Sequence, residues 1–76
     1  MVKPTRLSNT IKEHRVELGI TQAQLAEQVG VSRQTINAIE AGKYSPTLEL
    51  AMVIALVVKS SVESLFTLEG DLPHSG

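Results

Sequence analysis

Apolar residues recur at helical spacing along most of the chain, and glycines or capping residues interrupt the repeats. The first repeat contains Leu7, Ile11, His14 and Leu18, and Gly19 follows it. This pattern predicts a first helix from Leu7 to Leu18. We expect His14, near the edge of the inward face, to be a partly buried neutral side chain rather than a switch or a ligand.

Two short helical patterns follow and meet at a glycine with almost no loop between them. Thr21 precedes the first pattern and has Gln24 three residues later, the spacing at which side chain and backbone cap each other at a helix start. A helix is therefore predicted from Gln22 to Val29. Gly30 follows, at the position where a left-handed residue commonly ends a helix.

The second of these helices is expected to begin after Ser32, a good N-terminal cap, and to end before Gly42. Ile36 and Ile39 are spaced to face inward from it. Two helices joined this closely form a helix-turn-helix. The side chains left outward near the start of its second helix are Arg33, Gln34, Asn37 and Ala38, with Thr35 on the flank.

A fourth helix is predicted from Leu48 to about Val58, because Pro46 disfavours helix just before it and Thr47 can cap it. The nine residues from Leu50 to Val58 include no polar side chain. One face covers the core, through Leu50, Ile54 and Val57 or Val58. The remaining apolar side chains therefore predict a partner surface.

Ser61 is expected to cap a short last helix. Its apolar residues, together with those left outward on the fourth helix, predict an interface between two copies of the chain. That predicted homodimer interface consists of Val53, Leu56, Val62, Leu65 and Phe66.

Length and composition indicate one domain, since the 76 residues provide a single core. We expect an ordered core over residues 7–66, a loose arm over residues 1–6 and a flexible tail over residues 69–76. The chain has no cysteine, and its two histidines form no metal-binding pattern. The longest apolar run is far shorter than the about 20 residues of a membrane span, so we expect a cytoplasmic protein without metal or cofactor.

Charge is unevenly distributed along the chain. The formal net charge is −1, but residues 1–43 sum to +2 and residues 44–76 sum to −3. The more basic part could face phosphates while the acidic part faces away. A charge difference this small gives only weak support to nucleic-acid binding.

From Leu7 to Phe66 the chain resembles the phage repressor and xenobiotic-response-element family, the lambda-repressor-like DNA-binding domains. The resemblance rests on the small Ala26, on Gly30 in the turn, and on Ile36 and Ile39. It continues upstream through IKEHRVELGITQ and downstream through EAGKYSPTLELA. It implies an all-α, five-helix domain that binds double-stranded DNA as a transcriptional regulator, a repressor that acts as a homodimer on a two-fold operator.

The outward side chains suit the major groove, where each base pair shows a distinct pattern of donors and acceptors. Arginine suits guanine, glutamine and asparagine suit adenine, and the methyl groups of alanine and threonine can touch thymine. By family position, Arg33 and Gln34 are the best base readers, and Gln22 is placed to brace Arg33. The expected base contacts are Arg33, Gln34, Asn37, Ala38 and Thr35, and the expected backbone contacts are Gln22, Ser32, Lys43 and Tyr44.

The resemblance also implies a partly buried ion pair between Arg15 and Glu40, because both residues stand where the resembling repressors have such a pair. A guanidinium fork suits this geometry better than an ammonium group does. A direct phosphate contact by Arg15 is the alternative. The chain departs from the family at Val53 and Leu56, which are usually polar, and at Lys59, near which a glycine is usual.

An enzyme is not expected, because the chain has no glycine-rich phosphate loop, catalytic triad or paired carboxylates in an obvious pocket. Two alternatives to a repressor remain. An antitoxin or a restriction-modification controller would share the fold and the DNA chemistry. A protein-interaction module would keep the fold without binding DNA, but the basic and amide side chains on the outward face argue against it.

Overall fold

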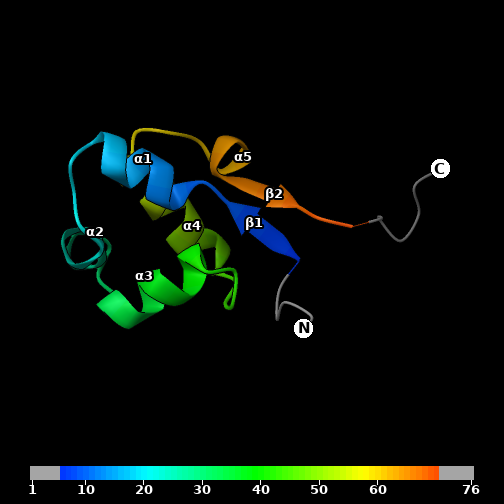
Figure 1. Ribbon diagram of the computed structural model, residues 1–76, viewed down its shortest axis with the longest axis horizontal. Helices are drawn as coiled ribbons and strands as arrows, with labels where there is room; N and C mark the ends of the chain where they lie inside the picture. Colours follow the sequence, from blue (N-terminus) through cyan, green and yellow to red (C-terminus); the bar gives the residue numbers. More distant parts are fainter. Residues whose placement is uncertain (1–5, 71–76) are drawn as a thin grey trace.

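The computed structural model describes residues 6–70, which form five helices with a small two-stranded sheet extending from one side (Figure 1). The five-helix fold expected from the sequence is confirmed, with the sheet as a minor addition. In chain order the elements are β1 (Leu7–Asn9), α1 (Ile11–Glu17), α2 (Gln22–Val29), α3 (Arg33–Glu40), α4 (Leu48–Val57), α5 (Val62–Leu65) and β2 (Phe66–Leu68).

The start of the first helix was predicted wrongly. Leu7 lies in β1, which pairs antiparallel with β2 so that Leu7 is opposite Leu68 and Asn9 is opposite Phe66. The helix begins at Ile11, because the residues just before it, Ser8, Asn9 and Thr10, favour caps and turns over helix interiors. Phe66, expected in the last helix, enters β2 instead.

The ends of the described chain extend this sheet. The backbone N–H of Glu69 donates to the carbonyl oxygen of Arg6 at 2.7 Å, and the Arg6 Nε donates to the carbonyl oxygen of Glu69 at 2.9 Å. Arg6 and Glu69, which the sequence analysis assigned to the predicted arm and tail, are thus paired with each other. The rest of the predicted arm and tail, residues 1–5 and 71–76, lies outside the described residues.

The core lies where α1, α2, α3, α4 and α5 meet. Ile36 and Ile39, expected to face inward from α3, are 0% and 1% exposed. From α4, Ile54 is fully buried and Val58, just after the helix, is 2% exposed, as the inward face predicted. Within residues 6–70, no helix is long and apolar enough to cross a membrane.

The helix starts follow the predicted caps. The Thr21 hydroxyl accepts from the Gln24 N–H at 3.0 Å, and the Gln24 side chain accepts from the Thr21 N–H at 2.8 Å, so the reciprocal cap is confirmed. Ser32, Thr47 and Ser61 each accept from a backbone N–H in the first turn of the next helix. These local bonds fix where α2, α3, α4 and α5 begin.

Lys59 ends α4 in a conformation that usually belongs to glycine. Its φ is +59°, and it is the non-glycine residue with a positive φ among residues 6–70. The Ser60 N–H then donates to the Ala55 carbonyl oxygen at 2.8 Å, which closes the helix end. The junction therefore keeps the geometry that glycine would give, at the cost of strain in a side-chain-bearing residue.

Candidate nucleic-acid interface

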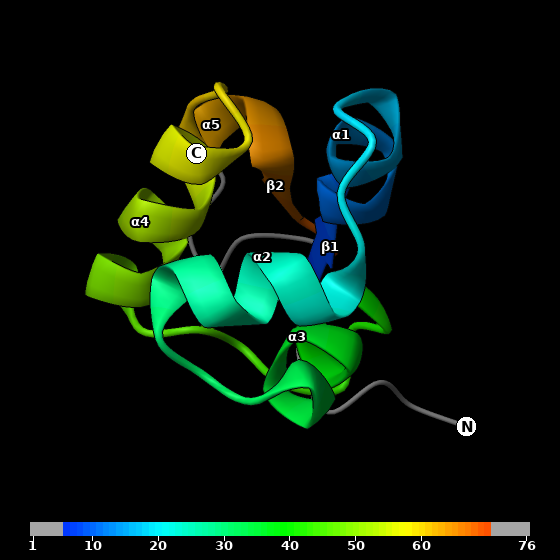
Figure 2. The same ribbon diagram turned by 90° about the vertical axis from the view of Figure 1, so that its left-hand side faces the viewer.

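The turn between α2 and α3 brings the two helices into close contact (Figure 2). Gly30 takes the left-handed conformation with φ +82°, and its N–H and that of Val31 both donate to the Ala26 carbonyl oxygen, at 2.9 and 3.0 Å. Ala26 itself is 3% exposed and belongs to the core that the helices share. The small side chain and the glycine thus set the angle at which α3 leaves the body.

The start of α3 is a polar, accessible surface. Arg33, Gln34 and Asn37 are exposed, whereas Thr35 and Ala38 are half-buried on its flank. Ser32 caps the helix by accepting from the Thr35 N–H at 3.1 Å. The predicted base-reading side chains therefore lie from the start of α3 to beyond its middle, with Thr35 and Ala38 less accessible than the other three.

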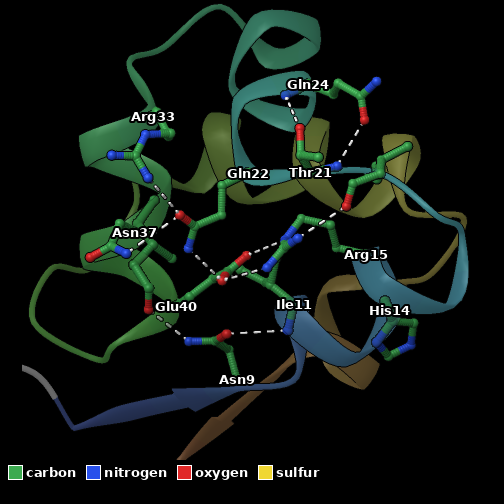
Figure 3. A network of polar contacts seen from close by, with 12 residues as sticks. Asn9, Ile11, His14, Arg15, Thr21, Gln22, Gln24, Arg33, Asn37 and Glu40 are labelled. Carbon is green, nitrogen blue, oxygen red and sulfur yellow. Dashed lines mark hydrogen bonds and ion pairs between the residues drawn. The ribbon is translucent and has the colours of Figure 1, made fainter.

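Gln22, the first residue of α2, reaches across to this surface. Its Oε1 accepts from Arg33 Nη1 and from Asn37 Nδ2, each at 3.4 Å. Figure 3 shows both contacts as dashed lines that meet at Gln22. The expected bracing of Arg33 by Gln22 is present, and Asn37 shares the same acceptor. The structure thus brings one predicted backbone-contacting residue together with two predicted base readers, while Gln34 is exposed and takes no part in these bonds.

Lys43 and Tyr44 extend the surface beyond the other end of α3. The Lys43 N–H donates to the Ala38 carbonyl oxygen at 2.9 Å and so closes the helix, while its side chain is exposed. Tyr44 is 46% exposed. Gly42, with φ +75°, allows the turn that carries both residues out of the helix.

Arg15 and Glu40 form a bidentate ion pair beneath this surface. Arg15 Nε donates to Glu40 Oε2 at 2.8 Å, and Arg15 Nη2 donates to Glu40 Oε1 at 3.3 Å. Arg15 Nη1 donates to the carbonyl oxygen of Ile20 at 3.0 Å. The two side chains are only 10% and 6% exposed, so the guanidinium is turned into the fold and away from solvent.

Glu40 is also connected, through Gln22, to the exposed side chains of Arg33 and Asn37. Gln22 Nε2 donates to Glu40 Oε1 at 3.0 Å, which makes one continuous chain of hydrogen bonds from the Ile20 carbonyl oxygen to Arg33 and Asn37 (Figure 3). The position of each side chain in this chain depends on its neighbours. The resemblance to the repressor family implied the ion pair but not this connection.

Asn9 is a structural residue that the sequence analysis missed. Its Nδ2 donates to the carbonyl oxygen of Ile39 at 2.8 Å, and its Oδ1 accepts from the Ile11 N–H at 3.2 Å. The second bond has a sequence signal, since an asparagine side chain commonly accepts from the backbone N–H two residues later, in an Asx turn. The first has none, because 30 residues separate Asn9 from Ile39.

His14 is half-buried within α1, and its Nδ1 donates to the Thr10 carbonyl oxygen at 2.9 Å. The ring therefore has a local backbone partner at the helix start. Across residues 6–70, no group of three or more histidine, cysteine, aspartate or glutamate side chains is placed to hold a metal ion.

The predicted dimer interface needs correction at Leu65, which is 1% exposed and belongs to the core of its own chain. Val53, Val62 and Phe66 are half-buried, and Leu56 is 77% exposed. Two further exposed residues of α4 lie on the same face as Leu56 at a spacing of four, and these are Met52, 54% exposed, and Leu48, 71% exposed.

The family model HTH_3, described as helix-turn-helix, matches residues 11–65. An uncharacterized HTH-type transcriptional regulator of Methanothermobacter thermautotrophicus is 55% identical over 62 residues, which are 80% of this chain and 90% of that protein. Another, from Methanocaldococcus jannaschii, is 46% identical over 65 residues, 86% of this chain and 98% of that protein.

Among solved structures, the fold resembles the crystal structure of SinR, the master regulator for biofilm formation, in complex with DNA. The TM-score is 0.66 with 29% sequence identity, over 71% of this chain and 87% of that chain. The family match covers more than half of the chain, and its residues include both helices of the motif and the core around them. The chain therefore belongs to the lambda-repressor-like helix-turn-helix family.

Proposed function

We propose that this protein is a sequence-specific DNA-binding transcriptional regulator that places the start of α3 in the major groove. The observation that carries the proposal is the exposed set of Arg33, Gln34 and Asn37 at one helix end, with Gln22 bonded beside it. Family membership and relatives named as transcriptional regulators support it, as does the DNA complex of SinR.

The proposed reading of bases follows from side-chain chemistry. Arg33 offers two parallel donors to guanine O6 and N7, while Gln34 and Asn37 each offer a donor and an acceptor to adenine. Ala38 and Thr35 are half-buried on the flank, so their role is limited to apolar contact with a thymine methyl group. Arg33, Gln34 and Asn37 therefore carry most of the proposed specificity.

Contacts with the sugar-phosphate backbone are proposed around this set. Gln22 and Ser32 lie at the starts of α2 and α3, where unpaired N–H groups and the helix dipole attract phosphate. Lys43 and Tyr44 are exposed beyond the far end of α3. Such contacts fix the orientation of the protein on the duplex without reading sequence.

Arg15 is assigned to structure rather than to phosphate. All three of its contacting nitrogen atoms face acceptors inside the fold, the Glu40 carboxylate and the Ile20 carbonyl oxygen. Three of the five guanidinium N–H groups are used inside the fold and only 10% of the side chain is exposed, so Arg15 has little to offer a phosphate.

We further propose a homodimer formed through α4. Leu48, Met52 and Leu56 make an exposed apolar row, and Met52 and Leu56 border a shallow hollow of ≈ 260 Å³ between α4 and α5. A two-fold pairing would bury the row of each copy against the other. Each fully buried side chain of this size contributes about 1.5–3 kcal/mol, so three per chain can outweigh the entropy lost on association.

A dimer also suits the proposed DNA site. One helix reads too few base pairs to select a site in a genome, whereas a two-fold dimer places a second α3 about 34 Å along the duplex. Repression in the cytoplasm is the proposed role, as in the resembling phage repressors, because occupying an operator requires only DNA binding and dimerisation.

Selection of bound sequences from random double-stranded DNA tests the proposal. The expected result is an enriched motif with two-fold symmetry, half-sites about one helical turn apart, and an affinity that falls with rising salt. An absence of enriched sequences, together with no salt-dependent binding of genomic fragments, would instead support a protein-interaction module.

A further inference from the structure

We propose that Glu40 helps to set the base preference of this protein without touching DNA. It does so by fixing the direction of the Gln22 amide, which in turn positions Arg33 and Asn37. The inference rests on the proposed DNA-binding function and assigns to Glu40 a positioning role beyond its ion pair with Arg15. Four observations about the hydrogen-bond chain in Figure 3 carry it.

The first observation is that the Glu40 carboxylate is held in place. Both of its oxygens accept from Arg15, at 2.8 and 3.3 Å, and only 6% of the side chain is exposed. Arg15 is itself anchored by the Ile20 carbonyl oxygen at 3.0 Å. The carboxylate therefore presents Oε1 to Gln22 from a fixed position.

The second observation is that this carboxylate can only accept hydrogen bonds. An amide has a donor end and an acceptor end, and either can be turned to a neighbour that both donates and accepts. An ionised carboxylate accepts only, so Gln22 must present its Nε2 to Glu40, and the two atoms lie 3.0 Å apart. Gln22 Oε1 must therefore face Arg33 and Asn37.

The third observation is that two donors of α3 converge on this oxygen. Arg33 Nη1 and Asn37 Nδ2 each lie 3.4 Å from Gln22 Oε1. The bonds are long and exposed, so each is weak alone, but both require an acceptor at that point. The hydrogen bonds from Arg33 and Asn37 through Gln22 therefore all run toward the Glu40 carboxylate, which accepts from Arg15 on its other side.

The fourth observation concerns which hydrogen-bonding atoms of Asn37 remain available to bind DNA. With Nδ2 bonded to Gln22, Asn37 has its Oδ1 and its second N–H free to form the bidentate pair with adenine. If the Gln22 amide were reversed, its NH₂ group would meet two donors. Asn37 would then turn its own oxygen toward Gln22 and present donors outward, which suits guanine better than adenine.

The experiment measures how tightly three variants bind DNA sites that carry each of the four bases at the positions read by Arg33 and Asn37. Glu40→Gln allows either end of its amide to face Gln22, and Gln22→Met keeps the length of the side chain but removes its amide. Arg15→Lys is the matched control, because it weakens the ion pair while Glu40 stays ionised. Thermal melts establish that each variant is folded at the temperature of the binding assay.

The expected result is that Glu40→Gln and Gln22→Met each reduce the preference for the best base by about three- to tenfold, a fraction of what one bidentate pair supplies. Since both act through the same amide, the double variant should lose no more than either single one. Arg15→Lys should lower the melting temperature and change the base preferences much less than Glu40→Gln does, because Glu40 can still only accept from Gln22.

Two outcomes overturn the inference. One is that Glu40→Gln and Gln22→Met weaken all sequences equally. The other is that Arg15→Lys alters the base preferences as much as Glu40→Gln does, since general distortion would then explain both. If Glu40→Gln does not fold, Glu40→Asp takes its place, because it keeps the charge but draws the carboxylate away from Gln22, and unchanged base preferences in that variant would overturn the inference.

A readout without DNA separates this inference from the proposed function. In the free protein, Glu40→Gln should shift the side-chain amide NMR signals of Gln22 and Asn37, while Arg15→Lys should move them much less. Wild-type protein that selects no DNA sequence would contradict the proposed function. Unchanged Gln22 and Asn37 signals in Glu40→Gln would contradict the positioning role, whatever the protein binds.

Discussion

The side-chain amide of Asn9 donates to the carbonyl oxygen of Ile39, 2.8 Å away, and so ties β1 to the last turn of α3. The same side chain accepts from the Ile11 N–H, at the start of α1. One residue outside the helices thus fixes where α1 begins and supplies a partner for a carbonyl near the end of α3. The orientation of the proposed DNA-reading helix depends on the strand as well as on the core.

Asn9→Ala is expected to reduce the free energy of unfolding by about 1–3 kcal/mol, because it leaves a carbonyl and an N–H without their partner. Chemical denaturation of the free protein measures this loss. Ser8→Ala is the matched control in the same strand, since the Ser8 hydroxyl makes only a long, exposed contact of 3.5 Å with Thr67. Equal stabilities of the two variants would contradict the role of Asn9.

The proposed division between base readers and backbone contacts predicts different losses. Arg33→Ala or Gln34→Ala should cost about 1–3 kcal/mol on the preferred site and much less on random DNA. Lys43→Ala should weaken binding to all sequences alike and reduce the slope of affinity against salt by about one. Titrations on both DNAs at several salt concentrations compare them, and equal losses for Arg33→Ala on both DNAs would reject the assignment.

Arg15→Ala should destabilise the free protein by about 3–5 kcal/mol, because it strands the Glu40 carboxylate in a poorly exposed position. Thermal melts without DNA measure the effect. Lys12→Ala is the control on the same helix, since Lys12 is exposed. If Arg15→Ala melted like the control and only weakened DNA binding, Arg15 would be a phosphate contact instead.

Leu56→Glu should convert the proposed dimer to a monomer, because it places a carboxylate of each copy in the apolar contact that the proposed interface needs. Sedimentation at micromolar concentration measures the change in mass. Val16→Glu is the matched control, since Val16 is 60% exposed on α1, outside the proposed interface. A monomeric wild type, or a dimer that survives Leu56→Glu, would rule out this interface.

Lys59→Gly should stabilise the protein by about 0.5–1 kcal/mol. Its φ of +59° strains a residue with a Cβ atom, and glycine relieves this strain while losing somewhat more entropy on folding. Thermal melts compare it with Lys59→Ala, which removes the charge but keeps the Cβ atom. A gain in Lys59→Ala equal to that in Lys59→Gly would point to the charge rather than to the backbone.

The predictable parts of the fold are those that depend on residues close together in the sequence. The cap formed by Thr21 and Gln24 and the turn at Gly30 depend on residues within one or two helical turns, so their spacing is sufficient. Leu7 matched the helical spacing of Ile11 by coincidence. Its actual partner, Leu68, lies too far along the chain for any periodicity to reveal the strand.

The candidate site was predictable as a set of residues but not as a network. Family position identified Arg33, Gln34 and the Arg15–Glu40 pair, whereas the link from Glu40 to Asn37 through Gln22 depends on how α2 and α3 cross. The outward face of α4 was not predictable for a different reason. A helix that is apolar all round has no periodicity to indicate which side chains, such as Met52, point away from the core.

The pairing of Leu7 with Leu68 brings the two ends of the described chain together. A short linker between residues 6 and 70 would therefore close the chain into a ring without disturbing either strand. New ends could then be opened at Gly19, an exposed residue between α1 and α2. In such a circular permutant α2 and α3 would be synthesised first, and the protein should still fold, because its contacts do not depend on where the chain is cut.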